Sequence, residues 1–261
     1  MDWRRGCPDS LGDHAVTGFW VISVRNWRRR WRLGLALLLM LLFLPVEIQS
    51  SPPARGGHEP GVTWYVKTPQ RLVALTFDDG PSPWTPRILA VLKAFGDSAT
   101  FFVLGSQAIK YPAIIRREVW LGMEVGNHTY GHINLTHHSI SEDYWDLTQT
   151  NRVVSRITGS PLSVMRPPYG AYNTITLRAA ARAGLHVILW SWTENSKNWK
   201  NPGVAEIVAN VMRHLQPGDI VLFHDAGKNL GPTLRALPII LKDLRALGYR
   251  CVTVSELMQV H

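Results

Sequence analysis

The chain has 261 residues, of which 46% are hydrophobic and 18% are charged. This balance is typical of a globular protein and excludes a disordered or fibrous one. The formal net charge of +9 suits an anionic surface such as a cell envelope, and no stripe of Arg and Lys interleaved with aromatic residues indicates nucleic-acid binding. The two cysteines, Cys7 and Cys251, are too few for a disulfide framework or a zinc–thiolate cluster.

The first fifty residues have a different character from the rest. Residues 25–32 hold five Arg and no acid, and residues 33–44 hold no charged side chain. A basic segment, a short apolar segment and small residues near Ser50 are typical of a secretory signal over 25–50. We therefore expect an exported protein, in the cell envelope or outside the cell.

Whether this signal is cleaved stays open at this point. Twelve apolar residues rise only about 18 Å as a helix, less than the ~30 Å that spans a bilayer. Extension over 33–48 would permit a membrane anchor. Residues 1–24 form an N-terminal extension of uncertain role, which suggests a natural start nearer Val24. Residues 51–61 are rich in Pro and Gly and are expected to form a linker.

From residue 62 onward, apolar runs of strand type alternate with segments of helical spacing. We expect strands at 72–77, 100–104, 124–126, 163–165, 186–190, 219–223 and 249–254, and helices at 86–95, 113–121, 140–158, 174–183, 204–215 and 234–247. This alternation predicts an α/β protein with a single catalytic domain over 62–261. About seven such units favour a distorted (β/α) barrel of about seven parallel strands over an open sheet.

Ionisable residues occur where four of the predicted strands stop. Asp78 and Asp79 follow the strand at 72–77, and His128 and His132 follow the one at 124–126; Arg166 and His224 directly follow the strands at 163–165 and 219–223. The carboxyl ends of parallel strands form the active face of α/β folds. We expect these side chains to meet there.

The two adjacent carboxylates at 78 and 79 allow two interpretations. A sequence of this type, followed by Gly80 and Pro81, also occurs as an acidic turn or a helix cap. Because adjacent side chains point in different directions, one carboxylate can also hold a metal ion while the other stays free as a base.

The histidines at 128 and 132 have the spacing of a pair on one face of a helical turn, where they can bind one cation. His137 and His138 lie nearby and compete for this role, but they follow no predicted strand. One carboxylate and two imidazoles leave a coordination position open for water, as catalytic zinc sites do. Oxygen and nitrogen ligands do not by themselves fix the identity of the metal.

Arg166 and His224 each allow a structural and a functional interpretation. Arg166 lies beside two prolines; it is either a surface residue or a partner that keeps Asp78 ionised and oriented. His224 is either a half-buried histidine with satisfied hydrogen bonds or a proton donor to a leaving amine.

Four motifs in order resemble those of the NodB-like polysaccharide deacetylases, carbohydrate esterase family four. They are Thr-Phe-Asp-Asp-Gly at 76–80, His-Thr-Tyr-Gly-His at 128–132, Arg-Pro-Pro-Tyr at 166–169 and Leu-Phe-His-Asp at 222–225. The resemblance covers roughly 65–257. It implies a distorted (β/α) barrel and removal of N-acetyl groups from glycans. Each motif is weak alone, and the four in order are specific.

The resemblance also implies a role for each matching residue. Asp79, His128 and His132 would bind a divalent metal, zinc by the habit of the family. Asp78 would be the general base, oriented by Arg166, and His224 the general acid. Tyr169 would offer its backbone N–H to the oxyanion, and Leu222 would line the pocket for the acetyl methyl group. Apart from the resemblance, Trp199 is expected to contact substrate, because an indole can stack on a sugar ring.

One segment departs from the family pattern. The family has an Asp before the Trp that corresponds to Trp199, and that Asp pairs with the acid histidine; here the position is Asn198. An amide carries no charge, so His224 is expected to be a poorer acid near neutral pH. The segment at 190–199 is about two residues longer than in the family, and Glu194 could substitute for the missing Asp if this longer loop folds inward. We expect a lower rate rather than a different reaction.

The expected function is hydrolysis of N-acetyl groups on peptidoglycan or N-acetylglucosamine oligomers by a monomer with a glycan substrate and no nucleic-acid partner. Two other functions stay open. One is a catalytically weak glycan-binding relative, which Asn198 and the abundant tryptophans permit. The other is an amidohydrolase of the same fold acting on a small cyclic amide, which an export signal disfavours.

Overall fold

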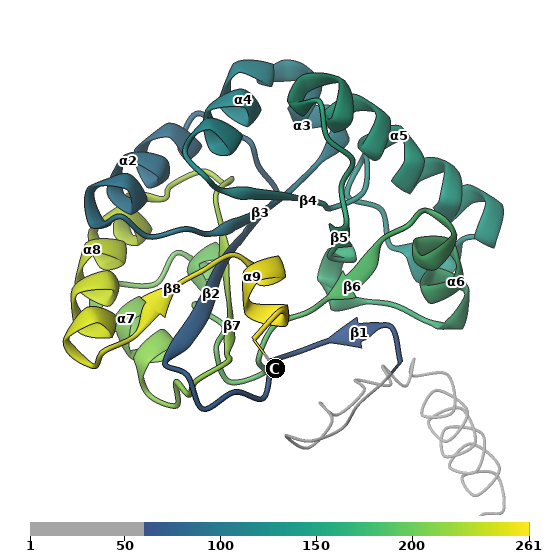
Figure 1. The fold of residues 1–261 in the computed structure, drawn as a ribbon. Coiled ribbons are helices and arrows are strands. Elements are labelled where there is room, and N and C mark those ends of the chain that lie inside the picture. The colour runs from purple at the N-terminus through teal and green to yellow at the C-terminus, as the bar shows by residue number, and fades with distance from the viewer. Residues whose placement is uncertain (1–59, 261) are drawn as a thin grey trace, which may run out of the picture. The chain divides into compact units, whose positions relative to one another are not determined.

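The computed structural model describes residues 60–260, and its framework is a sheet in which every strand ladder is parallel (Figure 1). The strands run in the order β1-β6-β5-β4-β3-β2-β7, and β8 also pairs with β2. They are β1 Val62–Thr63, β2 Leu72–Asp78, β3 Thr100–Val103, β4 Glu124–Asn127, β5 Val164–Met165, β6 His186–Ile188, β7 Ile220–His224 and β8 Arg250–Cys251. The parallel α/β fold expected from the alternation is confirmed.

Helices alternate with these strands and surround the sheet (Figure 1). They are α2 Thr85–Phe95, α3 Gly105–Lys110, α4 Pro112–Trp120, α5 Ile140–Thr158, α6 Thr174–Arg182, α7 Val204–Met212, α8 Gly231–Ala246 and α9 Val254–Met258, with 3-10 turns at Leu135–His137, Pro168–Gly170 and Asn198–Lys200. Most boundaries lie within three residues of those predicted. The short helix α3 was not predicted, since six residues are too few to show a helical period.

Strand β2 separates two apolar regions. Val73, Leu75 and Phe77 pack among the residues under the surrounding helices, whereas Leu72 and Ala74 belong to a second cluster inside the curve of the sheet. This alternation follows from the two-residue period of a strand. Thr76 and Asp78 continue the inner row, so the last residue of β2 carries its carboxylate to the open end of the interior.

The sheet curves toward a barrel, but its ladder does not close by itself, because β1 and β7 are its two ends. The chain after β6 fills this gap. Ser191 N–H donates to Ile220 O, Leu222 N–H to Glu194 O, and Ser196 N–H to Leu222 O, at 2.9–3.0 Å. The interior is thus lined on this side by irregular chain, which accounts for the distortion.

The end of the chain corrects one expectation. Residues 249–254 were predicted to be one strand, but only Arg250–Cys251 pairs with β2, and Val254 begins helix α9. Thr253 and Glu256 form a capping box there, a local signal that ends the strand. Cys251 is buried, in agreement with its apolar surroundings. Val254 and Leu257 cover the inner cluster where the strands begin, so the opposite end remains for the site.

The predicted extension (1–24), signal or anchor (25–50, with 33–48) and most of the linker (51–61) lie outside the described residues. Within 60–260, no helix is both long enough and apolar enough to cross a bilayer.

Candidate active site

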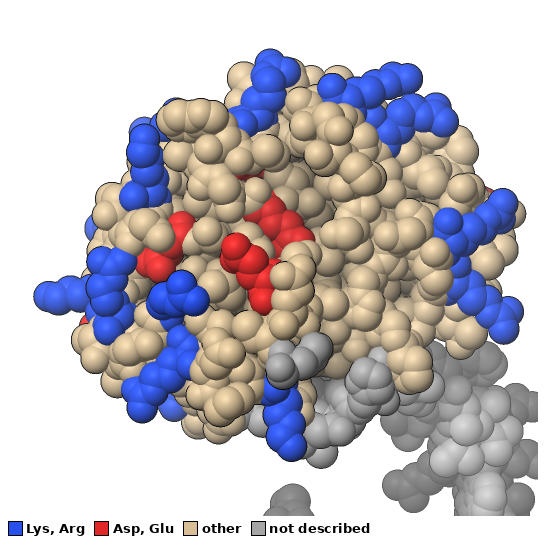
Figure 2. Space-filling model, in the orientation of Figure 1, with Lys and Arg blue, Asp and Glu red and all other residues tan. Residues whose placement is uncertain are grey.

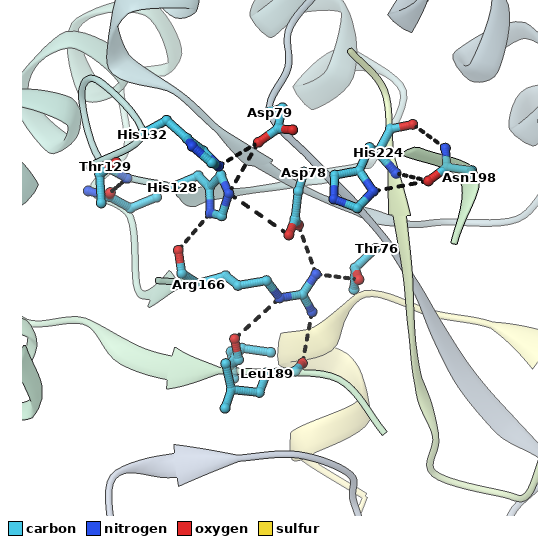
Figure 3. Close-up of polar contacts among 12 residues, drawn as sticks. Thr76, Asp78, Asp79, His128, Thr129, His132, Arg166, Leu189, Asn198 and His224 are labelled. Carbon is cyan, nitrogen blue, oxygen red and sulfur yellow. Dashed lines mark hydrogen bonds and ion pairs between the residues drawn. The ribbon is translucent and has the colours of Figure 1, made fainter. Parts of the chain in front are cut away.

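The ionisable residues predicted to meet do meet at the carboxyl ends of the strands (Figure 3). Asp78 ends β2 and His224 ends β7. These strands are neighbours, and Asp78 pairs in register with His224. His128 directly follows β4, and Arg166 directly follows β5. Parallel strands that end at one level therefore bring together residues from four distant parts of the sequence.

Asp79, His128 and His132 form a cluster whose ligand atoms all lie within 4.8 Å of one another. Asp79 Oδ1 lies 3.3 Å from His128 Nε2 and 3.2 Å from His132 Nε2. Burial disfavours ionisation of Asp79, but the two imidazoles outweigh it and hold the pKa of this carboxyl well below its usual range. A carboxylate kept ionised beside two ring nitrogens is a donor set that fits a divalent cation.

The orientation of His128 supports this fit. Its Nδ1 lies 2.7 Å from the carbonyl oxygen of Arg166, so Nδ1 carries the proton and the lone pair of Nε2 faces Asp79. Metal-binding histidines are commonly fixed in this way. Burial would lower the pKa of His128, but Asp78 and Asp79 together raise it. The negative charge of the two carboxylates therefore attracts a cation to this position, whether a proton or a metal ion.

The loop that carries the two histidines is not the helical turn that we predicted. Residues 128–132 have no helical assignment, and Thr129 and His132 have φ of 68° and 61°. The rings meet because left-handed residues fold the loop back on itself, and their centroids lie 5.2 Å apart. His137 and His138 are not part of the metal-binding group found among the described residues.

Asp78 is paired with Arg166, as predicted. Arg166 Nη1 lies 2.8 Å from Asp78 Oδ1, and the arginine is fully buried. The same guanidinium donates to Thr76 Oγ1 at 2.7 Å and to the carbonyl oxygen of Leu189 at 2.8 Å, and it stacks over the ring of Phe102 at 4.3 Å. Its Nε also donates to the carbonyl oxygen of Ile188 at 3.3 Å. Because these contacts fix the guanidinium, Arg166 holds one carboxylate oxygen of Asp78 in a fixed position.

His224 contacts Asn198, as the departure from the family pattern suggested. Its Nδ1 lies 3.0 Å from Asn198 Oδ1, which also accepts a hydrogen bond from the His224 backbone N–H at 3.1 Å. Asn198 Nδ2 donates to the carbonyl oxygen of His224 at 2.8 Å and to Thr233 Oγ1 at 3.3 Å. These bonds fix the amide orientation, so His224 Nδ1 is a donor and Nε2 faces the site.

Burial lowers the pKa of His224, although the nearby carboxylates of Asp78 and Asp79 oppose this. Glu194 is buried, and its backbone carbonyl binds β7 at Leu222. An influence of the Glu194 carboxylate on His224 stays a prediction.

The three residues expected at the substrate lie in different settings. Tyr169 is 68% exposed, has φ of 63° and packs edge-on against His132 with ring centroids 4.8 Å apart. Leu222 lies in β7 and is 3% exposed, whereas Trp199 is 59% exposed in a 3-10 turn beside Asn198. Only Tyr169 is in ring contact with a residue of the metal cluster.

Sequence reasoning missed one buried carboxylate next to the site. Asp225 follows His224, is fully buried and accepts a hydrogen bond from Thr85 Oγ1. Burial raises its pKa to about 7. A side chain at Gly80 would overlap the Asp225 carboxylate, since a Cβ there would lie 2.2 Å from Oδ2. The motif at 222–225 contained Asp225, but nothing in the sequence showed that it packs against the loop after Asp79.

Residues 65–188 match the protein-family model described as polysaccharide deacetylase. A peptidoglycan-N-acetylglucosamine deacetylase of Bacillus cereus is 38% identical over 199 residues, which cover 76% of this chain and 93% of that protein. The chain belongs to the polysaccharide deacetylase family. The membership predicted from the four motifs is thereby confirmed.

Solved structures of this deacetylase family have the same fold. The peptidoglycan N-acetylglucosamine deacetylase Bc1960, solved with a hydroxamate-type benzamide ligand, has a TM-score of 0.73 and 33% identity, over 77% of this chain and 94% of that one. A CE4 family pseudoenzyme from Bacillus anthracis has a TM-score of 0.72 and 28% identity, over 77% and 70%. The fold is therefore found among relatives described as enzymes and among relatives described as pseudoenzymes, and activity depends on the side chains of the site.

Proposed function

We propose that this deacetylase family member removes N-acetyl groups from an N-acetylated glycan and releases acetate, with peptidoglycan or N-acetylglucosamine oligomers as substrate. One observation carries the proposal. The cluster of Asp79, His128 and His132 lies beside a second carboxylate, Asp78, which is not part of that group. Arg166 holds Asp78 Oδ1 at 2.8 Å, and Asp78 Oδ2 lies 4.0 Å from His128 Nε2. A cation site next to an independent base is what amide hydrolysis requires.

Asp79, His128 and His132 would hold a divalent metal, which we propose to be zinc because one carboxylate and two imidazoles suit it. When bound, such an ion supplies Lewis-acid polarisation of the amide carbonyl and makes water in the site more acidic. The proposed ligands are the residues that the four motifs indicated.

The remaining roles belong to the side chains around this cluster. Asp78 accepts the proton of the attacking water, and Arg166 keeps its carboxylate in position. His224, protonated on Nε2, donates a proton to the departing amine, without which the C–N bond does not break. The products are acetate and a free amine on the sugar.

Three further residues would contact the substrate. Tyr169 offers its backbone N–H to the oxyanion. Leu222 lines the pocket for the acetyl methyl group. The exposed ring of Trp199 stacks on a sugar face.

The charge distribution supports a substrate in an anionic envelope. Nineteen of the twenty described Lys and Arg side chains are exposed, whereas seven of the fourteen described Asp and Glu side chains are buried. On the face in Figure 2, basic residues lie around the edge and acidic ones near the centre. We propose an exported monomer, with a catalytic domain over 62–261 and either a cleaved signal or an anchor within 25–50.

A catalytically weak glycan-binding protein is the second candidate, and the contact between Asn198 and His224 favours it. Burial lowers the pKa of His224, and its partner Asn198 carries no charge that would raise it. Less of the acid form is therefore present near neutral pH than for a free imidazole. The proposed metal ligands and the proposed base do not favour a weak binder, because all of these residues are present in the site.

Acetate release from the full chain tests both candidates. The purified protein is incubated with zinc or cobalt and with peptidoglycan, N-acetylglucosamine oligomers or N-acetylmuramic-acid-containing fragments, with Asp79→Ala as the control. Release that disappears in Asp79→Ala supports the deacetylase and identifies the sugar. One bound metal per chain without acetate from any glycan supports the weak binder.

A further inference from the structure

The loop that carries His128 and His132 has an unfavourable backbone. Thr129 has φ of 68° and is fully buried, and His132 has φ of 61°. A β-branched residue rarely adopts a positive φ, because its side chain crowds the backbone. Such a conformation persists only when the surrounding structure determines it. In Figure 3, Thr129 lies beside His128, to its left, so the strain is located next to the proposed metal site.

Helix α5 supplies part of that support through two buried side chains. Asp146 Oδ1 accepts a hydrogen bond from the Tyr130 backbone N–H at 2.7 Å, and Asn127 Oδ1 accepts one from the Thr129 backbone N–H at 2.7 Å. Asn127 is in turn held by α5, because its Nδ2 donates to Leu147 O at 2.9 Å and to Asn151 Oδ1 at 2.8 Å. Both N–H groups of the strained turn are thus tied to one helix.

Helix α3 holds the other side of the same turn. The carbonyl oxygens of Thr129 and Tyr130 accept hydrogen bonds from the backbone N–H groups of Gly105 and Ser106, each at 3.0 Å. Gly105 is packed so closely that a Cβ there would lie 2.6 Å from the Tyr130 ring and 2.7 Å from Thr150 Oγ1 on α5. The loop therefore lies between two helices. Its N–H groups donate to Asp146 of α5 and to Asn127 of β4, which α5 holds, and its carbonyl oxygens accept from N–H groups of α3.

We infer that Asp146 and Asn127 are positioning residues, which act through the backbone of 129–130 to keep His128 and His132 at the distance needed to bind one metal ion. This inference rests on the metal site proposed above. Neither side chain is a proposed metal ligand, and neither lies in one of the four motifs. The carboxylate of Asp146 is the stronger acceptor, since a hydrogen bond to a charged group is about twice as strong as a neutral one.

The inference predicts an effect on metal affinity rather than on stability alone. Loss of a group that orients metal ligands typically weakens binding about 10–100-fold. We expect Asp146→Leu to weaken Co²⁺ binding by at least about tenfold and to change the visible absorption of the bound cobalt, which reports ligand geometry. Asp146→Asn keeps an oxygen that accepts from Tyr130 and should restore most of the affinity.

A matched control lies one turn earlier on the same helix. Asp143 is also buried, and neither of its oxygens has a hydrogen-bond partner among the described residues. Asp143→Leu makes the same change of chemistry without touching the loop, and we expect cobalt affinity and spectrum to stay as in the wild type. Thermal unfolding of the metal-free proteins shows that each variant is folded before titration.

Titration with Co²⁺ against a chromophoric chelator, using the full chain, decides the question. Wild-type affinity and spectrum in a folded Asp146→Leu variant would overturn the inference and leave Asp146 a purely structural residue. If that variant does not fold, Asp146→Ser replaces it with the same two outcomes. Absence of cobalt binding by the wild type would instead refute the proposed metal site itself.

Discussion

Replacing Asn198 by Asp tests how the acid histidine is tuned. The change places a carboxylate 3.0 Å from His224 Nδ1. Two unit charges about 4 Å apart attract by roughly 4 kcal/mol at an effective dielectric constant of 20, and about 1.4 kcal/mol corresponds to one pKa unit. The pKa of His224 can therefore rise by at most about 3 units. Because the new carboxylate is itself buried, we expect this pKa to rise by about 1–2 units.

The sign of the effect on activity follows from the proposed role of His224 as the general acid. A general acid works in its protonated form, so activity is lost as the pH rises through its pKa. In the wild type, burial lowers this pKa, and the high-pH limb of the rate profile should begin below neutrality. Asn198→Asp should move that limb upward by about 1–2 pH units and increase kcat/KM at pH 8 by up to about tenfold per unit.

The structure also predicts a cost in stability. Asn198 Nδ2 donates to the His224 carbonyl at 2.8 Å, and an aspartate would place an oxygen there instead. Loss of this bond and repulsion between the two oxygens should lower the free energy of unfolding by about 1–3 kcal/mol. An Asn198→Asp variant that is more active but less stable would therefore support both contacts, the one from residue 198 to His224 Nδ1 and the one to the His224 carbonyl.

The assay is acetate release between pH 5 and pH 9, with Asn201→Asp as the control for added charge. Asn201 is exposed, and its side chain contacts Asn229 rather than His224. If Asn198→Asp and Asn201→Asp give the same pH profile as the wild type, the proposed coupling between residue 198 and His224 is wrong.

Three other predictions concern charge. Arg166→Met removes the cation from the buried Asp78 carboxylate and should lower the urea-unfolding free energy by about 3–5 kcal/mol; an unchanged midpoint would contradict it. Burial raises the pKa of Asp143 to about 6, so the contribution of Asp143 to stability falls as the pH rises from about 4 to about 6. Asp143→Asn should therefore be the more stable protein at pH 8 but not at pH 4. Binding to anionic wall material through the exposed Lys and Arg residues should weaken from low salt to 0.5 M NaCl, because salt screens these charges. Hydrolysis of neutral oligomers should change little over the same range. Equal salt dependence in both assays would argue against an envelope-binding surface.

The metal cluster shows how far sequence patterns reach. The four motifs in order predicted Asp79, His128 and His132 as one group, and the structure brings these three side chains together. The helical turn proposed from the i, i+4 spacing was wrong, because positive φ angles at Thr129 and His132 replace it. A spacing records only which residues are available, and the loop conformation depends on hydrogen bonds from α3 and α5 that are distant in sequence.

The fold shows the same division. The period of apolar residues determined the alternation of strands and helices, since burial of one face is a local requirement. It misplaced the last strand, because pairing with β2 reaches only Arg250 and Cys251 before the capping box at Thr253 begins a helix. The period of apolar residues also could not show that the chain after β6 fills the gap between β1 and β7. That arrangement depends on hydrogen bonds to β7, a strand far along the sequence.

The amino-acid sequence by itself determined the parallel α/β class, the family and the residues that can do the chemistry, because these depend on local periods and on motifs. The contact between Asn198 and His224 was expected from the family pattern, but only the tertiary structure decided that Asp225 packs against Gly80 and that α5 holds the loop of His128 and His132. Those contacts join residues up to 145 positions apart, between Gly80 and Asp225. These contacts form only when the sheet curves and its strand ends come together, and a local sequence pattern does not specify contacts between residues so far apart.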